Sequence, residues 1–365
     1  KYGGQLYETT TFRTEGSYTD GRHPDAVQFV PDVREDLARR DFTINAMAYN
    51  EAEGLVVPFG GQKDLQNGLL RAVGEPQQRF TEDALRILRL YRFAARFGFA
   101  LDATTARAAR QLAPHLDCIS AERIQEELAK LLAAPQPGAY LEPAVLAVVL
   151  PELTPAALDA AKPVVDACPA GEQALPVRLA ALLLSLGEDG TRRTLRRLRC
   201  SNACIEETAV LVREARGRDG SFSEDRPLGW DPVAAGNRAG DGMARIVSEE
   251  KATVTPDFTI YARRLLGKYN LCTVQRLAAL GTALQPERSA DFAALSELAE
   301  RLDADGVCCR VSQLAVNGRD LMAAGVPAGP GIRKVLEALL DGVIREEYPN
   351  ERQALLAAVQ QLAAS

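Results

Sequence analysis

Residues 82–93 read EDALRILRLYRF, and this stretch marks the point where the chain turns helical. Thr81 stands before two acids, an order typical of a helix N-terminus, because a hydroxyl caps free N–H groups and acids favour the positive end of the helix dipole. Leu85, Leu88 and Ala95 then recur near helical spacing. We therefore predict a helix that begins near Thr81 and a helical chain beyond it.

Apolar periodicity predicts the later helices. They span 103–113, 121–134, 175–186, 191–199, 204–216, 257–267, 273–282, 290–302 and 333–345. The Pro/Gly-rich stretch 218–242 reads as an irregular connection or a domain boundary.

The first 75 residues have a different pattern, rich in β-formers. We expect strands over 6–12, 55–58 and 69–73, and an amphipathic helix over 36–49. The predicted fold class is therefore α+β, with a small α/β head followed by an elongated all-α remainder.

Composition limits the class of protein. The chain has 365 residues, enough for more than one domain, and 47% hydrophobic with 25% charged residues is typical of a globular protein. A net charge of -6 gives no overall attraction for nucleic acid, so RNA contacts must come from local basic patches. Seven cysteines without a CxxC pair and only two histidines favour free buried thiols in a reducing cytosol over a zinc site.

Asp83 and Arg86 lie three positions apart, so on a helix they project from one face. Cytosine and adenine each present an exocyclic amine beside an unprotonated ring nitrogen. A carboxylate and a guanidinium match both bases, whereas uracil and guanine present a keto oxygen beside an N–H. Such a pair would reject a wrong base by leaving buried polar groups unpaired. The alternative is an intrahelical salt bridge worth about 0.3–0.5 kcal/mol.

A row of arginines continues from this pair. Arg86, Arg89, Arg92 and Arg96 recur at three-to-four spacing beside an apolar face. Guanidiniums placed this way repel one another unless anions lie among them, and a triphosphate is a natural candidate. The row therefore favours nucleotide binding over the isolated salt bridge.

A second polar segment, residues 39–49, reads RRDFTINAMAY. Asp41 and Asn45 are four apart on one face of the expected helix, where they could hold a ribose hydroxyl or order a neighbouring loop. Arg40 could meet a phosphate. A solvated, charged helix start is the alternative.

Together, the two segments resemble the motifs RRDxxxNA and EDxxR of the class II tRNA nucleotidyltransferase and poly(A) polymerase family. Residues 59–65 (FGGQKDL) and 70–74 (LRAVG) look like the family's hinge region, and 122–128 (ERIQEEL) is similar to its neck-helix motif ERxxxEL. The tail, from 314–321 (LAVNGRDL) to Gly329, Pro330 and Asn350, is similar to the C-terminal end of bacterial CCA-adding enzymes.

This resemblance implies template-independent addition of C, C and A to the 3′ end of tRNA from CTP and ATP, with release of pyrophosphate. It implies that Asp83 and Arg86 select the base, that Arg40, Arg89 and Arg92 bind the nucleotide, and that Asp41 and Asn45 form the ribose-side motif. It also implies a cytoplasmic enzyme without a membrane partner.

The resemblance suggests four parts: an N-terminally truncated nucleotidyltransferase-type head over 1–75, a nucleotide-selecting neck over 76–150, a body over 151–270 and a tRNA-binding tail over 271–365. The basic run 192–199 is the best candidate for further tRNA contact, because phosphates could lie along Arg192, Arg193, Arg196 and Arg197. A plain solvated face is the alternative.

The family's metal site involves two Mg²⁺ ions, which offset charge on the attacking and leaving oxygens. In the family, two of the carboxylates form a DxD that follows a Gly-Gly strand, and this sequence opens at Lys1 without that segment. Its DxD at 303–305 lacks such a strand and reads as a solvated turn. Glu8 matches the family's third carboxylate and is the candidate catalytic residue, with an edge-strand surface glutamate as the alternative. We therefore expect impaired catalysis.

Two other functions compete with CCA addition. A bacterial poly(A) polymerase shares the head and neck motifs, but the CCA-like tail and the missing basic C-terminal extension count against it. Residues 12–24 resemble the flexible loop that the family needs to switch from C to A, which favours CCA addition. The third hypothesis is a non-catalytic tRNA-binding remnant.

Overall fold

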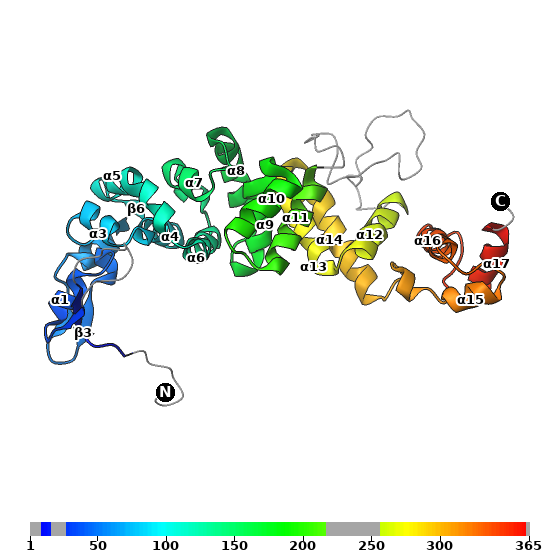
Figure 1. Cartoon of the computed structure of the whole chain (residues 1–365), viewed down its shortest axis with the longest axis horizontal. Coiled ribbons are helices and arrows are strands. Elements are labelled where there is room, and N and C mark those ends of the chain that lie inside the picture. The colour runs from blue at the N-terminus through cyan, green and yellow to red at the C-terminus, as the bar shows by residue number, and fades with distance from the viewer. Residues whose placement is uncertain (1–8, 16–26, 217–255, 363–365) are drawn as a thin grey trace. The chain divides into compact units, whose positions relative to one another are not determined.

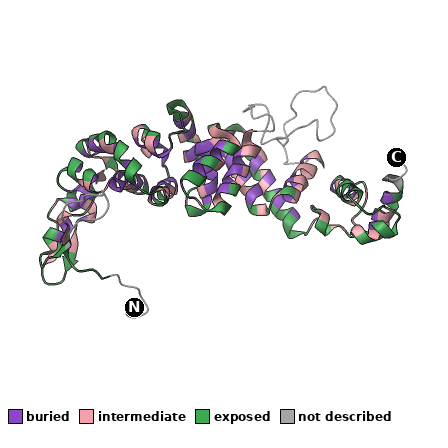
Figure 2. Cartoon of the chain, in the orientation of Figure 1, coloured by how far each residue is buried: buried purple, intermediate pink, exposed green. Residues whose placement is uncertain are grey.

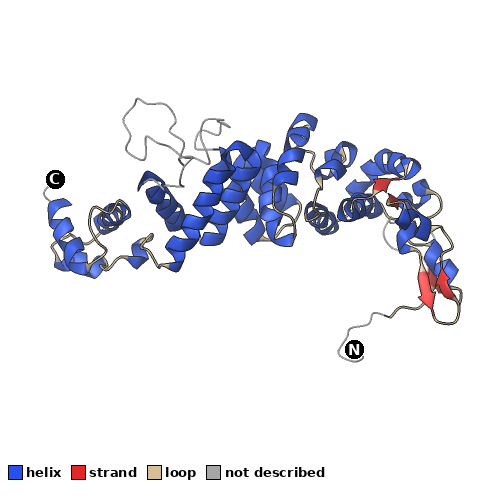
Figure 3. Ribbon diagram, turned by 180° about the vertical axis from the view of Figure 1, so that it is seen from behind, coloured by secondary structure: helices blue, strands red, loops and turns tan. Residues whose placement is uncertain are grey.

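The computed structural model describes residues 9–15, 27–216 and 256–362, which are mostly helical with short strand pairs near the N-terminus (Figures 1 and 3). They belong to two compact units, Lys1–Val212 and Arg213–Ser365. The predicted class, α+β with a small α/β head followed by helices, is confirmed. The four-part division stays a prediction.

The head is built from short elements. They are β1 (Arg13–Glu15) paired antiparallel with β2 (Val27–Phe29), α1 (Val33–Ala38), η1 (Thr43–Asn45), β3 (Ala48–Asn50) paired antiparallel with β4 (Gly54–Val56), α2 (Gly61–Gln66), and β5 (Leu69–Leu70) paired parallel with β6 (Ala100–Leu101). The strands expected over 55–58 and 69–73 correspond to β4 and β5. The strand expected over 6–12 falls partly outside the described residues, and its residues 9–12 are not in a strand.

The prediction of a helix over 36–49 is wrong, because α1 ends at Ala38. The Asp41 carboxylate accepts a hydrogen bond from the backbone N–H of Phe42 at 2.9 Å. Such a bond gives the backbone an alternative to the helical pattern. Phe42 is extended and fully buried, and it forms a bridge with Ala72. The chain therefore turns through η1 instead of continuing as a helix.

A break at Asp83 divides the helix that the sequence predicts from Thr81. Thr81 lies inside α3 (Pro76–Glu82), where its hydroxyl donates to the carbonyl of Gln77 at 2.8 Å, so its prediction as an N-cap is wrong. Asp83 is extended, with φ −144° and ψ 103°, and its carboxylate accepts from the N–H of Leu85 at 3.0 Å. That bond starts α4 (Leu85–Phe97), which ends at Gly98 with φ 68°.

The rest of the first unit is helical and confirms the ranges expected there. Its elements are α5 (Ala103–Leu112), η2 (Ala113–Cys118), α6 (Ala121–Leu132), η3 (Gly138–Tyr140), α7 (Pro143–Val149), α8 (Pro155–Ala167), η4 (Glu172–Ala174), α9 (Leu175–Leu183), η5 (Leu184–Leu186), α10 (Gly187–Arg197) and α11 (Asn202–Arg216), whose last turn crosses the boundary between the units. α4 packs against α6, α3 against α5, and α8 against α9. Figure 2 shows buried residues along α4 and α9.

The second unit contains the remaining helices. They are α12 (Pro256–Lys268), α13 (Leu271–Leu284), η7 (Pro286–Arg288), α14 (Ser289–Ala304), η8 (Val311–Gln313), α15 (Gly318–Ala323), α16 (Gly331–Ile344) and α17 (Arg352–Leu362). The four helices expected in this unit are confirmed, while the sequence missed α15 and α17. Among the described residues, no helix is long and apolar enough to span a bilayer. The stretch 218–242 lies outside them.

Arg178 holds the centre of the first unit together. Its side chain is fully buried, and burial lowers the pKa of its guanidinium, although arginine still keeps its charge. All three of its nitrogens donate to backbone carbonyls at the ends of α6 and α8, those of Leu132, Ala134, Pro135, Cys168 and Pro169. A cation is favourable at a helix C-terminus, so one side chain on α9 satisfies the ends of two other helices.

We expect Arg178→Met to lower the free energy of unfolding by about 3–5 kcal/mol, because it leaves several buried carbonyls without a donor. Chemical denaturation of the wild type and the variant measures this loss. Arg193→Met, a change at an exposed residue of α10, is the control and should stay within about 0.5 kcal/mol of the wild type. Equal losses in both variants would contradict the role of Arg178.

Candidate nucleotide site

Two arginines that follow α1 converge on one buried acid, Asp36. Arg39 donates to it through Nε at 3.0 Å and Nη2 at 2.7 Å, and Arg40 through Nη2 at 3.2 Å. Burial alone would raise the pKa of Asp36, but the hydrogen bonds and charge of these arginines, with the N–H of Arg13, leave it below its ordinary value. The side chain of Arg40 is 44% exposed, so its guanidinium remains within reach of a ligand.

Asp41 joins this segment to α4. One of its carboxylate oxygens accepts from the amide of Asn45 at 3.2 Å, and the other receives Arg89 through Nε at 2.8 Å and Nη2 at 2.6 Å. The structure therefore brings Asp41 and Asn45 together, as the sequence predicts. It does so through the η1 turn, whereas the prediction placed both residues on one face of a helix.

Each arginine of α4 that reaches this site meets a protein carboxylate. Arg86 donates to Glu82 at 2.9 Å, Arg89 to Asp41, and Arg92 contacts Glu127 of α6 at 2.6 Å. The sequence led us to expect a bound anion among these guanidiniums, and here the protein supplies anions of its own. Burial lowers the pKa of Arg92, and Glu127 opposes that shift.

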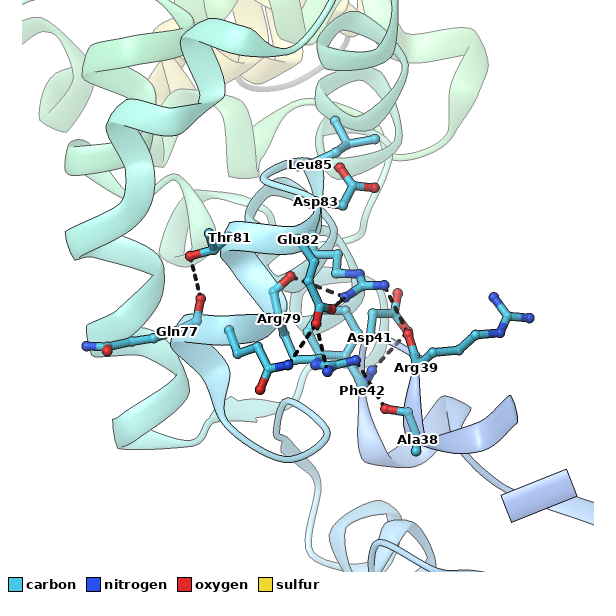
Figure 4. Close-up of polar contacts among 12 residues, drawn as sticks. Ala38, Arg39, Asp41, Phe42, Gln77, Arg79, Thr81, Glu82, Asp83 and Leu85 are labelled. Carbon is cyan, nitrogen blue, oxygen red and sulfur yellow. Dashed lines mark hydrogen bonds and ion pairs between the residues drawn. The ribbon is translucent and has the colours of Figure 1, made fainter. Parts of the chain in front are cut away.

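Asp83 and Arg86 do not form the salt bridge that was the alternative to base reading. Asp83 lies before α4, and its Oδ2 accepts from Nη2 of Arg123 on α6 at 3.0 Å. Arg86 instead donates to Glu82 and to the carbonyls of Arg79 and Arg39. Figure 4 shows the Asp83 carboxylate apart from the contacts that join Arg79, Glu82 and the segment at Arg39.

Five residues of this site were not assigned from the sequence: Asp36, Arg79, Glu82, Arg123 and Glu127. Glu82 binds both Arg79 and Arg86, while Arg123 and Glu127 reach the site from α6. Glu82 belongs to the EDxxR motif, and Arg123 and Glu127 to ERxxxEL, so the motifs contained the signal. Arg123 and Asp83 lie 40 positions apart, and no local pattern identifies such a pair. Glu82, by contrast, pairs with Arg79 and Arg86 at a spacing of three and four positions.

Two of the four arginines predicted to bind RNA, Arg192 and Arg197, pair with acids of the protein. Arg192 pairs with Glu188 at 3.0 Å and also with Glu206. Arg197 donates to both carboxylate oxygens of Glu152, at 2.9 and 2.8 Å. Arg193 and Arg196 are exposed on α10. An RNA contact on this helix, if it forms as predicted, would therefore fall mainly to Arg193 and Arg196.

The described residues do not supply a metal site. No group of three His, Cys, Asp or Glu side chains that could hold an ion occurs among them, and Asp41, Glu82 and Asp83 are each engaged by an arginine. Asp303 and Asp305 are exposed at the C-terminal end of α14. Glu8, the candidate catalytic and metal-binding residue, lies outside the described residues, as do residues 16–24 of the predicted switching loop.

Three family models match parts of the chain. The model described as "Poly A polymerase head domain" matches residues 1–71. The model described as "Probable RNA and SrmB- binding site of polymerase A" matches residues 98–157, and a model of tRNA nucleotidyltransferase domain 2 matches residues 247–359.

Similarity to curated proteins extends over nearly the whole chain. A CCA-adding enzyme of Geobacillus stearothermophilus is 32% identical over 370 residues, covering 97% of this chain and 78% of that enzyme. The chain belongs to the CCA-adding enzyme family. Another member, from Levilactobacillus brevis, is 34% identical, with 98% of this chain and 80% of that enzyme covered.

Solved structures of the family agree with the fold. The crystal structure of the Bacillus stearothermophilus CCA-adding enzyme in complex with CTP has a TM-score of 0.74 and 28% identity, covering 99% of this chain and 80% of that one. The Thermotoga maritima CCA-adding enzyme complexed with tRNA has a TM-score of 0.59 at 22% identity, covering 91% and 74%, and it supports the fold alone. Enzymes of this family generally use divalent metal ions.

The lowered pKa of Asp36 predicts a pH dependence. In the folded state this carboxyl ionises below its ordinary value, so it stabilises the fold above the pKa of the unfolded chain, and the effect is lost as pH falls through the folded pKa. The unfolding free energies of the wild type and Asp36→Asn should differ most above about pH 5 and converge below about pH 4. Urea denaturation across this range measures the difference, and a constant gap would contradict the prediction.

Proposed function

We propose that this protein adds C, C and A to the 3′ end of tRNA from CTP and ATP, with Asp83 and Arg86 reading the base. The observation that carries the proposal is the placement of an acid and a guanidinium three positions apart at the α3–α4 junction, each with hydrogen-bonding capacity left over. Membership of the CCA-adding enzyme family supports it across nearly the whole chain.

The hydrogen bonds that Asp83 and Arg86 already make determine the hydrogen-bonding capacity that remains. The Asp83 carboxylate offers about four lone-pair sites and uses one for the N–H of Leu85 and one for Arg123. Arg86 uses both Nη1 hydrogens and one Nη2 hydrogen, which leaves Nε–H and the second Nη2–H. An acceptor and donors therefore remain for the amine and the ring nitrogen that cytosine and adenine share.

Arg40, Arg89 and Arg92 are the proposed phosphate contacts, and Asp41 with Asn45 supports the ribose side. Arg89 uses only Nε and Nη2 on Asp41, so Nη1 remains for a phosphate oxygen. Arg40 is part-exposed beside Asp36. Arg92 is 9% exposed and held by Glu127, so it would meet a ligand only through the donors that Glu127 leaves.

We also propose that the metal is Mg²⁺, bound as two ions. When bound, such ions would neutralise charge on the attacking and leaving oxygens and on the pyrophosphate. The described carboxylates do not fit this role, so the proposal rests on Glu8 and on the family. A cytoplasmic location is part of the same proposal, because none of the seven cysteines, all within the described ranges, forms a disulfide.

The tRNA contacts belong to this proposal as well. Arg193 and Arg196 are exposed on α10, and the tail over 271–365 is the second candidate surface. Phosphate contacts of this kind weaken steeply as salt rises.

The full-length gene product, given tRNA that lacks its CCA end together with CTP and ATP, should extend the tRNA by C, C and A. It should not extend oligo(A). Labelled nucleotides resolved on a sequencing gel measure both reactions. Extension of oligo(A) without incorporation of CTP would favour the poly(A) polymerase, and a gel shift of tRNA without any incorporation would favour the non-catalytic remnant.

Asp83→Ala and Arg86→Ala should lose the preference for CTP over UTP before they lose nucleotide binding, because the arginines that would hold the phosphates remain. We expect the preference to fall by about two orders of magnitude. Relative incorporation of CTP and UTP at the tRNA end measures this. Asp159→Ala, which removes an exposed acid of α8 paired with Lys162, should change nothing. An unchanged preference in the Asp83 or Arg86 variants would refute base reading by this pair.

A further inference from the structure

The neck helix α6 reaches the nucleotide site through two side chains of opposite charge. Arg123 and Glu127 are four positions apart, so they share one face of α6. Arg123 donates to Asp83 at 3.0 Å, and Glu127 contacts Arg92 at 2.6 Å. The proposed base reader and a proposed phosphate contact are thus both tied to the same helix.

Asp83 lacks the support that a residue inside a helix receives. Its backbone is extended between α3 and α4, and its side chain is held at both oxygens: Oδ1 by the N–H of Leu85 and Oδ2 by Arg123. A carboxylate held at one oxygen can still turn about its side-chain bonds, whereas two contacts fix its direction. Arg123 is the contact that a substitution can remove without changing the backbone.

Arg123 is less fully hydrogen-bonded than Arg178. In Arg178 every guanidinium nitrogen donates to a carbonyl. In Arg123, by contrast, Nη1 is buried and has no hydrogen-bond partner among the described residues. A buried donor without a partner costs stability, so this placement favours the contact with Asp83 over satisfaction of the guanidinium itself.

We propose that Arg123 is a positioning residue that determines base specificity by aiming the Asp83 carboxylate at the exocyclic amine of the incoming nucleotide. The inference rests on the proposed base reading by Asp83 and Arg86. With Asp83 fixed, the keto oxygen of uracil would meet a carboxylate oxygen and be repelled. Without Arg123 the carboxylate can turn aside, so UTP gains affinity and CTP loses it.

Glu127 provides the contrast. It acts on Arg92, which is proposed to contact phosphates common to every nucleotide. Loosening Arg92 should therefore lower the affinities for CTP and UTP to a similar degree and leave the ratio of the two affinities unchanged. The two residues of α6 should thus give different signatures: a change of ratio for Arg123, and a common loss of affinity for Glu127.

Equilibrium binding of CTP, ATP and UTP to the full-length gene product tests the inference. Arg123→Met should lower the ratio of CTP to UTP affinity by about tenfold, and ATP affinity should fall together with CTP affinity. Glu127→Gln should lower all three affinities and keep the ratio. Arg110→Met, which removes a part-exposed ion pair between α5 and Glu142, is the matched control and should leave binding unchanged.

A double variant tests whether Arg123 acts through Asp83. Once Asp83 is replaced by alanine, adding Arg123→Met should change the CTP to UTP ratio by less than about twofold. Arg123→Lys keeps the charge but loses the planar guanidinium, so it should fall between the wild type and Arg123→Met. If Arg123→Met does not fold, as judged by thermal melting, the drop of the ratio in Arg123→Lys decides the question.

Failure of the proposed base reading and failure of the role of Arg123 give different results. A wild-type protein without preference for CTP over UTP would overturn base reading and this inference together. A wild type with that preference, combined with folded Arg123 variants that keep or exceed it, would overturn the role of Arg123 alone. A further large drop of the ratio in the double variant would also overturn it, because Arg123 would then act by another route.

Discussion

The ion pair between Asp41 and Arg89 is the contact on which the site depends. It joins the segment after α1 to α4 across 48 positions, with Nε and Nη2 of Arg89 both contacting one oxygen of a nearly buried carboxylate. The neighbouring arginines of α4 need similar partners, because guanidiniums three and four apart repel one another. Glu82 and Glu127 supply them, and α4 is thereby fixed to α3 and α6.

These ion pairs hold the guanidiniums of α4 in fixed positions, and that has consequences for binding a nucleotide. Removing one partner of a buried ion pair leaves an uncompensated charge, which costs more than the pair contributes. The acids therefore hold the guanidiniums in place, while each guanidinium keeps donors that the acids do not use. A site preorganised in this way loses little conformational freedom on binding, so more of the interaction energy remains for discrimination between bases.

The sequence predicted the helices with clear apolar periodicity and the segments that form the site, but it could not predict how the chain bends between them. The prediction of a single helix over 36–49 was wrong because the Asp41 side chain competes for the N–H of Phe42. The expected N-cap at Thr81 was wrong because the chain breaks at Asp83, two residues later. Ion pairs such as that between Arg197 and Glu152 could not be predicted from the sequence either, since the partners are 45 positions apart.

A site that accepts both cytosine and adenine cannot rely on shape, because the two bases differ in size. It must rely on the direction of a few hydrogen bonds, and direction depends on what holds each side chain. In this fold α6 holds Asp83 through Arg123 and Arg92 through Glu127. A shift of α6 relative to α4 would therefore move the proposed base-reading acid and the proposed phosphate contact together.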